Sequence, residues 1–249
     1  MHTAVILVGG KGSRLLELTK NFPKPMLSIG HEPFLIMLMK NINRFGIEKF
    51  ILLSGHAHEV LEEHFKNNYY NFDVKLIPEK EPLGTGGAIK NALKFLPEEF
   101  FCFNGDSILL GNWLKIKDLV NDNVDVSIAL TEINDSSRYG GVTLGQNNIV
   151  RSFNEKSSSR KFINAGIYFL RKKIFEKIDK YNFSLESDIF PNIASEKKIK
   201  AKKIDGYFID IGIKDDLKRA RLKKWNKNAS HAVIFDRDGT LIEDKGYTY

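Results

Sequence analysis

Short apolar runs alternate with helix-like segments through the first 105 residues, and this alternation restricts the fold more than any other feature. The runs are TAVILVGG (3–10), KFILLSG (49–55), DVKLIPE (73–79) and FFCFNG (100–105). The intervening segments, such as PFLIMLMKNINRFG (33–46) and AHEVLEEHFKNN (57–68), have the apolar spacing of helices. Strands joined by helices pair in parallel. We therefore expect an α/β fold with a Rossmann-like, mainly parallel mixed sheet flanked by helices.

Past residue 120 the apolar stretches become shorter and alternate with polar residues, as in DVSIALTEI (125–133) and INAGIYFL (163–170). Such alternation indicates a mixed or antiparallel extension of the sheet. In parallel sheets, ligands bind at the carboxyl ends of the strands. Three polar or glycine-rich loops follow predicted strands, so we expect them to meet at one edge: LVGGKGSRL (7–15), PEKEPLGTGG (78–87) and NGDS (104–107).

The net charge of +7 does not require a nucleic-acid partner. The basic residues concentrate in EKKIKAKK (196–203) and RARLKKWNK (219–227), which lack interleaved aromatic residues, so we interpret both as solvated helix faces or linkers. There is no apolar run of about 18 residues and no secretory leader, which predicts a cytoplasmic protein without a membrane partner. The single cysteine, Cys102, is expected to be a buried, inert thiol.

The loop LVGGKGSRL has the properties of a phosphate-binding segment. Gly9, Gly10 and Gly12 let backbone N–H groups approach an anion, and Arg14 adds a planar fork of donors. The loop matches neither GxxxxGK[ST] nor the dinucleotide fingerprint, because Leu15 occupies the third glycine position. A plain strand-to-helix turn is the alternative interpretation.

GGKGSRL followed by PKPM resembles the signature of the nucleotidyltransferases that activate sugar 1-phosphates. Further matches follow in the family's order: EPLGTGGAI (81–89), NGD (104–106), YGGV (139–142), FNEK (153–156), NAGIY (164–168) and FIDIG (208–212). The resemblance covers residues 3 to about 217 and implies the nucleotide-diphospho-sugar transferase fold. It also implies catalytic roles for Arg14, which holds the triphosphate, and for Lys24, which bridges the reacting phosphates. The other implied nucleotide-binding residues are Leu7, Gly9, Gly10, Gly12, Ser13, Glu79, Gly84, Thr85 and Asn104.

Nucleotidyl transfer needs a cation to neutralise the polyphosphate, usually Mg²⁺ held by one or two carboxylates. Asp106 and Asp210 each end an apolar strand-like run, and the resemblance places metal ligands at both motifs, so we predict a Mg²⁺ site there, with Asp106 also catalytic. A turn-capping aspartate is the alternative for Asp106.

Glu79 falls where the resemblance places the residue that meets the pairing edge of the base. A carboxylate accepts two hydrogen bonds, and guanine offers two donors on that edge, whereas uracil and thymine offer one donor flanked by acceptors. The hypothesis is therefore GTP as the nucleotide substrate. A glutamate in an exposed loop is the alternative.

For the sugar 1-phosphate, the resemblance implies binding by Tyr139, Gly141, Glu155, Lys156 and Asn164. A salt-bridged Glu155 and Lys156 on a hairpin is the alternative. We expect the sugar-phosphate oxygen to attack the α-phosphorus in line with the leaving pyrophosphate, without a covalent enzyme intermediate. Arg14, Lys24, Lys156 and the metal would spread the charge.

The tail FDRDGTLIEDKGY (235–247) resembles the first motif of haloacid-dehalogenase-type phosphatases, with Asp236 and Asp238 as its two aspartates, and looks like the heptose bisphosphate phosphatases in particular. The later motifs of that fold are missing, so we expect no phosphatase activity. The predicted division is a nucleotidyltransferase domain at 1–226 and, at 227–249, a linker with the truncated start of a second domain.

The substrate expectation follows from both parts of the chain. The first domain is similar to D-glycero-α-D-manno-heptose-1-phosphate guanylyltransferases, and the phosphatase-like tail agrees with a heptose substrate. Mannose 1-phosphate with GTP, and N-acetylmuramate 1-phosphate with UTP, stay open. So do a non-catalytic nucleotide-sugar-binding regulatory protein and a homo-oligomeric state.

Overall fold

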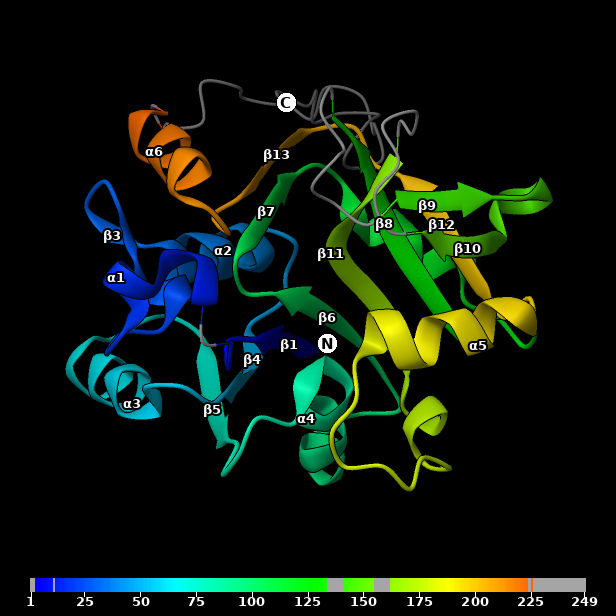
Figure 1. Ribbon diagram of the computed structural model, residues 1–249, viewed down its shortest axis with the longest axis horizontal. Coiled ribbons are helices and arrows are strands. Elements are labelled where there is room, and N and C mark those ends of the chain that lie inside the picture. The colour runs from blue at the N-terminus through cyan, green and yellow to red at the C-terminus, as the bar shows by residue number, and fades with distance from the viewer. Residues whose placement is uncertain (1–2, 11, 134–140, 155–161, 224, 226–249) are drawn as a thin grey trace, which may run out of the picture.

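A nine-stranded mixed sheet runs through the centre of the molecule (Figure 1). The structure, a computed structural model, describes residues 3–10, 12–133, 141–154, 162–223 and 225. Four strands pair in parallel in the order β5, β4, β1, β6. They are β1 (Thr3–Leu7), β4 (Lys49–Ser54), β5 (Asp73–Pro78) and β6 (Glu99–Asn104). These are the four strands that the sequence predicts, so the Rossmann-like half of the sheet is confirmed.

Beyond β6 the sheet becomes mixed, as the change of pattern past residue 120 predicts. β11 (Phe162–Arg171) is antiparallel to β6, β8 (Val126–Glu132) is antiparallel to β11, and β12 (Ile199–Lys203) is parallel to β8. β9 (Gly141–Leu144) and β10 (Val150–Asn154) form an antiparallel pair beside β11. The remaining strands are β2 (Ser28–Ile29), β3 (Glu32–Pro33), β7 (Ser107–Leu110) and β13 (Tyr207–Asp210).

The interpretation of EKKIKAKK as a helix face or linker is wrong, because most of this segment is strand β12. Ile199 and Ala201 are fully buried against the neighbouring strand, while Lys203 is exposed. Apolar residues alternate with lysines here, which is the two-residue period of a strand, and lysines are common on edge strands. The second basic run begins inside a helix and is partly exposed, as expected.

Helices cover both faces of the sheet. The α-helices are α1 (Leu16–Thr19), α2 (Phe34–Asn43), α3 (His58–Asn67), α4 (Gly84–Ala92), α5 (Phe190–Ser195) and α6 (Lys214–Leu222). The 3₁₀ segments are Ser13–Leu15, Lys24–Met26, Leu93–Phe95, Trp113–Leu119, Gln146–Asn148 and Lys172–Phe175, and Leu185–Ile189 forms a π-helical turn.

Alternate residues of β1 belong to two separate cores. Ala4 and Ile6 pack in the core of α2 and α6, and Val5 packs in the core of α4 and α5. Cys102 is buried in the second core, as predicted, and burial raises the pKa of its thiol well above the usual value. No helix in the described part of the chain is long and apolar enough to cross a membrane.

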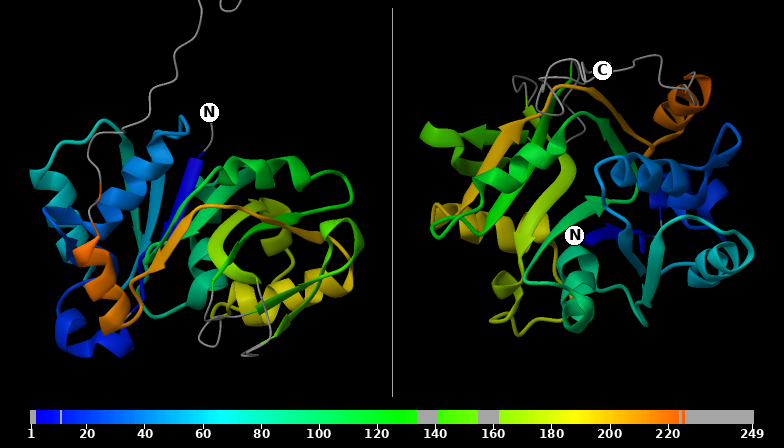
Figure 2. Two further views of the ribbon diagram at one scale, coloured as in Figure 1. Left: turned by 90° about the horizontal axis from the view of Figure 1, so that it is seen from above. Right: turned by 180° about the vertical axis from the view of Figure 1, so that it is seen from behind.

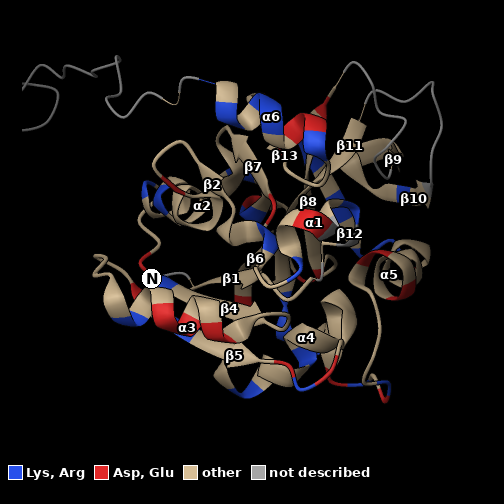
Figure 3. Cartoon of the chain, turned by 60° about the vertical axis from the view of Figure 1, so that its left-hand side comes forward, with Lys and Arg blue, Asp and Glu red and all other residues tan. Residues whose placement is uncertain are grey.

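The C-terminal helix α6 packs beside the N-terminal third of the chain. Figure 2 shows α6 in orange next to the blue segments in both views, and Arg221 donates a hydrogen bond to the Ser28 carbonyl oxygen. Figure 3 shows acidic residues at the start of α6 and basic residues at its end, the distribution that complements a helix dipole. The chain reaches α6 through β13, so the position of β13 determines where Asp210, its last residue, lies.

Candidate active site

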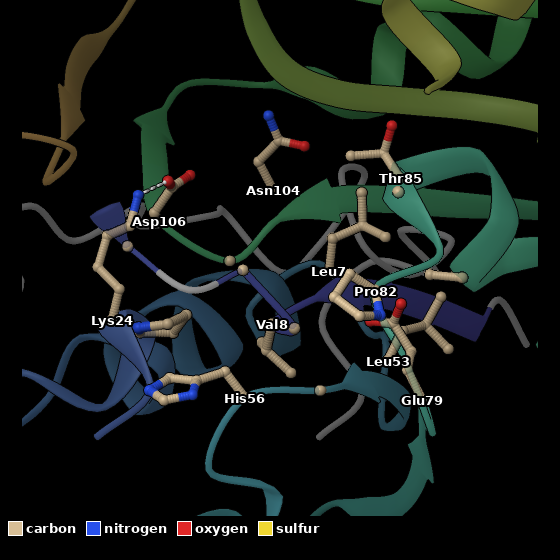
Figure 4. Close-up of a pocket in the computed structure, with 18 of the residues that line it drawn as sticks. Leu7, Val8, Lys24, Leu53, His56, Glu79, Pro82, Thr85, Asn104 and Asp106 are labelled. Atoms are coloured by element: carbon tan, nitrogen blue, oxygen red, sulfur yellow. Dashed lines mark hydrogen bonds and ion pairs between the residues drawn. The ribbon is translucent and has the colours of Figure 1, made fainter. Parts of the chain in front are cut away.

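A cavity of about 520 Å³ opens at the carboxyl ends of β1, β4 and β6. The three loops that the sequence predicts to meet at one edge all contribute to its wall. The lining residues are Leu7, Val8, Gly9, Gly10, Gly12, Lys24, Pro25, Leu53, Gly55, His56, Glu79, Lys80, Glu81, Pro82, Gly84, Thr85, Ala88, Asn104, Gly105 and Asp106. Figure 4 shows Lys24 and Asp106 at one end and Glu79 at the other, a separation suited to a long ligand with chemically different ends.

The glycine-rich loop is held against the end of β4. The Thr19 hydroxyl donates to the carbonyl oxygens of Gly12 and Leu15, each over 3.1 Å, and His56 Nε2 lies 2.7 Å from the Thr19 carbonyl oxygen. Arg14 is exposed and is not among the lining residues. Sequence reasoning missed His56, although its place directly after a strand and Gly55 is the signal that identified the other loops.

Lys24 and Asp106 form an ion pair at the floor of the cavity. Lys24 begins a 3₁₀ turn after Pro23, and its Nζ donates to Asp106 Oδ2 over 2.5 Å. Asp106 lies in the turn after β6, and this turn depends on Gly105, where a Cβ would lie 2.6 Å from the Leu7 carbonyl oxygen. A cation and a carboxylate are therefore fixed next to the backbone where β1 ends.

Asp210 reaches the same place from the far end of the chain. β13 is antiparallel to β7, and their register places Asp210 opposite Ser107. The Ser107 hydroxyl lies 3.3 Å from Asp106 Oδ1 and 3.5 Å from Asp210 Oδ2, and Ile211 N–H donates to the Asp106 carbonyl oxygen. Burial and the charge of Asp106 raise the pKa of the Asp210 carboxyl from 3.8 to about 6.

The two carboxylates suit a hard divalent cation. Asp106 is paired with Lys24, whose charge also acts on Asp210, and the two carboxylates still repel each other. Mg²⁺ binds through one or two carboxylates plus phosphate oxygens. The described residues contain no group of three or more His, Cys, Asp or Glu arranged for a metal.

Asp210→Asn is expected to stabilise the metal-free protein above pH 6 by about 1–3 kcal/mol. In the wild type, the native state binds this proton more tightly than the unfolded state, because the pKa rises from 3.8 to about 6. Its ionisation therefore costs stability progressively from about pH 4 to pH 6, and fully above pH 6. Asparagine keeps the acceptor for Gly212 N–H without the charge. Urea unfolding in EDTA at pH 4 and pH 8 measures the difference in unfolding free energy between the two proteins, which should vanish at pH 4. An equal difference at both pH values would contradict the raised pKa of Asp210.

Glu79 forms the opposite end of the cavity. Its Oε2 accepts a hydrogen bond from Leu83 N–H over 2.8 Å, and its Oε1 lies over the backbone of Gly9 and Gly55. Burial raises the pKa of Glu79, and the bond from Leu83 opposes part of the rise. A Cβ at Gly9 would lie 2.2 Å from Oε1, so glycine there leaves room for the carboxylate. Glu79 is partly buried and lines the cavity, although Lys80 and Glu81 beside it are exposed.

The glycines at the start of α4 have a packing role that the sequence does not reveal. Gly86 and Gly87 N–H groups both donate to the Phe183 carbonyl oxygen, over 3.0 and 3.2 Å. A Cβ at Gly87 would lie 2.1 Å from the Tyr181 carbonyl oxygen, and one at Gly86 would lie 2.3 Å from the Phe183 ring. The LGTGG segment is thus glycine-rich because the chain at 181–186 rests on it.

We expect Gly87→Ala to lower the unfolding free energy by about 1–3 kcal/mol, although alanine favours helix formation. The new methyl group would collide with backbone that cannot rotate away. Gly10→Ala is the matched control, because a Cβ there meets no atom within 4 Å. Chemical denaturation measures both, and equal stability of the two variants would contradict this packing role.

Asn164 and Gly141 lie beyond the cavity on the antiparallel side. Gly141 pairs with Ile163, next to Asn164. Gly166 has a φ of +71°, and a Cβ there would lie 2.7 Å from Asn104 Nδ2, so glycine lets β11 pass close to Asn104. Asn104 Oδ1 is the one buried side-chain polar atom of the described residues without a hydrogen-bond partner, which leaves it available to a ligand.

Several candidate residues lie outside the described residues. They are Tyr139, Glu155, Lys156, Asp236 and Asp238, and the side chain of Ser13 is also not described.

The chain is similar to known transferases over most of its length. A family model described as Nucleotidyl transferase matches residues 3–226. The D-glycero-alpha-D-manno-heptose 1-phosphate guanylyltransferase of Campylobacter jejuni is 40% identical over 217 residues, which cover 86% of this chain and 96% of that protein. The enzyme of the same name from Aneurinibacillus thermoaerophilus is 38% identical over 222 residues, covering 88% and 96%.

A solved structure extends the similarity to three dimensions. HddC from Yersinia pseudotuberculosis, crystallised in complex with GMP-PN, superposes with a TM-score of 0.78 at 36% identity, covering 89% of this chain and 98% of that chain. The fold is therefore that of the nucleotide-diphospho-sugar transferases, and the chain belongs to the nucleotidyl transferase family of enzymes.

Proposed function

We propose that this protein transfers GMP from GTP to D-glycero-α-D-manno-heptose 1-phosphate and releases pyrophosphate. The observation that carries the proposal is the polarity of the cavity, with the Glu79 carboxylate at one end and the Lys24–Asp106 ion pair at the other, where Asp210 lies behind the wall against Ser107. The relatives named as heptose 1-phosphate guanylyltransferases support the same base and sugar.

Guanine suits Glu79 because the carboxylate can accept both N1–H and the exocyclic amine. Leu83 N–H occupies one side of the carboxylate and limits its rotation. The apolar side chains of Leu7, Leu53 and Ala88 also line the cavity, and apolar walls suit the faces of a flat base. The base would lie there with its ribose toward Asn104.

At the other end, Lys24 would contact the phosphates of the nucleotide. Mg²⁺ held by Asp106 and Asp210 would supply charge neutralisation at the α-phosphate when bound. Backbone N–H groups of Gly9, Gly10 and Gly12 would cradle the remaining phosphates, and Arg14 would reach them from the loop. In the chemical step the sugar-phosphate oxygen would attack the α-phosphorus in line with the leaving pyrophosphate, without a covalent enzyme intermediate.

The sugar 1-phosphate would bind over β9 and β11, beside Gly141 and Asn164, with Tyr139, Glu155 and Lys156 completing its site. We also propose that residues 227–249 form a linker and the start of a phosphatase-like second domain after a transferase domain at 1–226. A tail of that kind supports a heptose substrate. Mannose 1-phosphate is the second candidate, because it differs only by a shorter arm.

Pyrophosphate release tests the proposal. GTP, ATP, UTP and dTTP are each paired with heptose, mannose, N-acetylmuramate and glucose 1-phosphates. GTP with the heptose 1-phosphate should give the highest kcat/KM. Faster turnover with UTP or dTTP would overturn the base assignment, and faster turnover with mannose 1-phosphate would overturn the sugar. Nucleotide binding without release from any pair would indicate a regulatory protein.

A further inference from the structure

Glu186 is a polar residue near the cavity to which the proposed reaction gives no role. It lies in the π-helical turn Leu185–Ile189, which Ser184 caps by accepting hydrogen bonds from the backbone N–H groups of Glu186 and Ser187. The preceding chain rests on the glycines at the start of α4. This docking brings the Glu186 carboxylate against Thr85, which lines the cavity.

The carboxylate of Glu186 is held by three hydroxyl groups. Its Oε2 accepts from Thr85 Oγ1 over 2.8 Å and from Ser184 Oγ over 2.9 Å, and its Oε1 accepts from the Tyr168 hydroxyl over 2.9 Å. A carboxylate has about four acceptor sites, so little of its capacity is left for a substrate. Thr85 Oγ1 in turn accepts from Leu185 N–H over 2.8 Å, which fixes the direction in which its proton points.

The same network continues to the sugar side through Tyr168. This side chain is fully buried, and Asn164 Nδ2 donates to its hydroxyl oxygen over 2.9 Å, while Asn164 Oδ1 accepts from Gly166 N–H. Burial, with the charge of Glu186 adding to it, raises the pKa of Tyr168 well above its usual value, so the phenol keeps the proton that it donates. Asn164 is thereby held at both ends of its amide.

We infer that Glu186 is a positioning residue that holds Thr85, on the nucleotide side, and Tyr168 with Asn164, on the sugar side, in one hydrogen-bonded frame. The inference rests on the proposed function, since it assumes that a nucleotide and a sugar phosphate bind at these two places. The frame joins helix α4, strand β11 of the central sheet and the turn before α5. It would keep the two substrates at the separation that in-line attack requires.

Tyr168→Phe is the most selective test, because the buried hydroxyl cannot touch either substrate. We expect the KM for the sugar 1-phosphate to rise about tenfold, with kcat changed less than about threefold and the Kd for GTP unchanged. Glu186→Gln places an amide N–H₂ against hydroxyl donors, so it should raise both the KM for the sugar 1-phosphate and the Kd for GTP, each about tenfold. Steady-state kinetics and calorimetry of GTP binding measure these quantities.

Thr85 offers a matched pair of variants for the nucleotide side. Thr85→Ser keeps the hydroxyl and should keep the wild-type Kd for GTP within about twofold, whereas Thr85→Val, equal in shape, should weaken binding about tenfold. Ser195→Ala, on the exposed end of α5, should change nothing. Thermal unfolding checks that each variant folds; if Glu186→Gln does not, Tyr168→Phe and the Thr85 pair still decide.

A wild-type KM for the sugar 1-phosphate in Tyr168→Phe would overturn the inference. So would equal Kd values for GTP in the serine and valine variants at position 85. If the wild type releases no pyrophosphate with any substrate pair, the proposed function fails instead. The nucleotide that binds most tightly then serves as the probe, and unchanged binding in Glu186→Gln and Thr85→Val would overturn the positioning role by itself.

Discussion

Asp106→Asn is expected to lower kcat by about 1,000-fold while the protein stays folded. Asparagine has nearly the same shape but lacks the negative charge with which Asp106 binds Lys24 and the proposed metal ion. The variant therefore removes one of two carboxylates from the proposed metal site and releases Lys24 from its 2.5 Å ion pair. Pyrophosphate release under saturating substrates measures kcat.

A second measurement separates metal binding from other effects on activity. Titration of the protein with Mn²⁺ alone, followed by electron paramagnetic resonance, should show weaker binding in Asp106→Asn than in the wild type. Asp205→Asn is the matched control, because Asp205 is exposed and pairs with Lys203 at the surface. Near-normal turnover in Asp106→Asn, or unchanged Mn²⁺ binding, would contradict the assignment of Asp106.

Glu79→Gln is expected to lower kcat/KM for GTP by about 30-fold, equivalent to about 2 kcal/mol, and to raise that for UTP. The amide can still accept from Leu83 N–H through its oxygen, but its N–H₂ group then faces the two donors of guanine. The same N–H₂ group can donate to a carbonyl oxygen of uracil. The change therefore turns a repulsive contact with uracil into an attractive one.

Competition between GTP and UTP in one reaction measures the switch directly. Glu98→Gln is the control, because the Glu98 side chain is 82% exposed and is not among the residues that line the cavity. Burial raises the pKa of Glu79, so this carboxylate takes up its proton at a higher pH than an exposed glutamate does. The preference of the wild type for GTP over UTP should therefore decline on acidification as Glu79 is protonated. An unchanged GTP-to-UTP ratio in Glu79→Gln would rule out readout of the base by this side chain.

The sequence predicted β1, β4, β5 and β6 and the helices α2 and α3 between them, because burial imposes a period of two or 3.6 on neighbouring residues. The three loops of the cavity wall were found for a related reason, since each follows a recognisable strand and strand ends share one edge. The resemblance then singled out Glu79 and Asn104. The lysine-rich strand β12 was missed, because only two apolar residues, Ile199 and Ala201, stand among its lysines and carry little of that signal.

What the sequence by itself determined is thus the order of strands and helices, the family and the loops that form the cavity wall. The resemblance already paired Asp210 with Asp106, but only the tertiary structure decided how the two meet, because that depends on the register between β13 and β7, whose facing residues Ser107 and Asp210 are 103 positions apart. It also decided that Glu186 joins Thr85 to Tyr168. Local periodicity reflects which face of an element is buried, whereas these contacts depend on how distant elements pack, and no pattern of neighbouring residues encodes that packing.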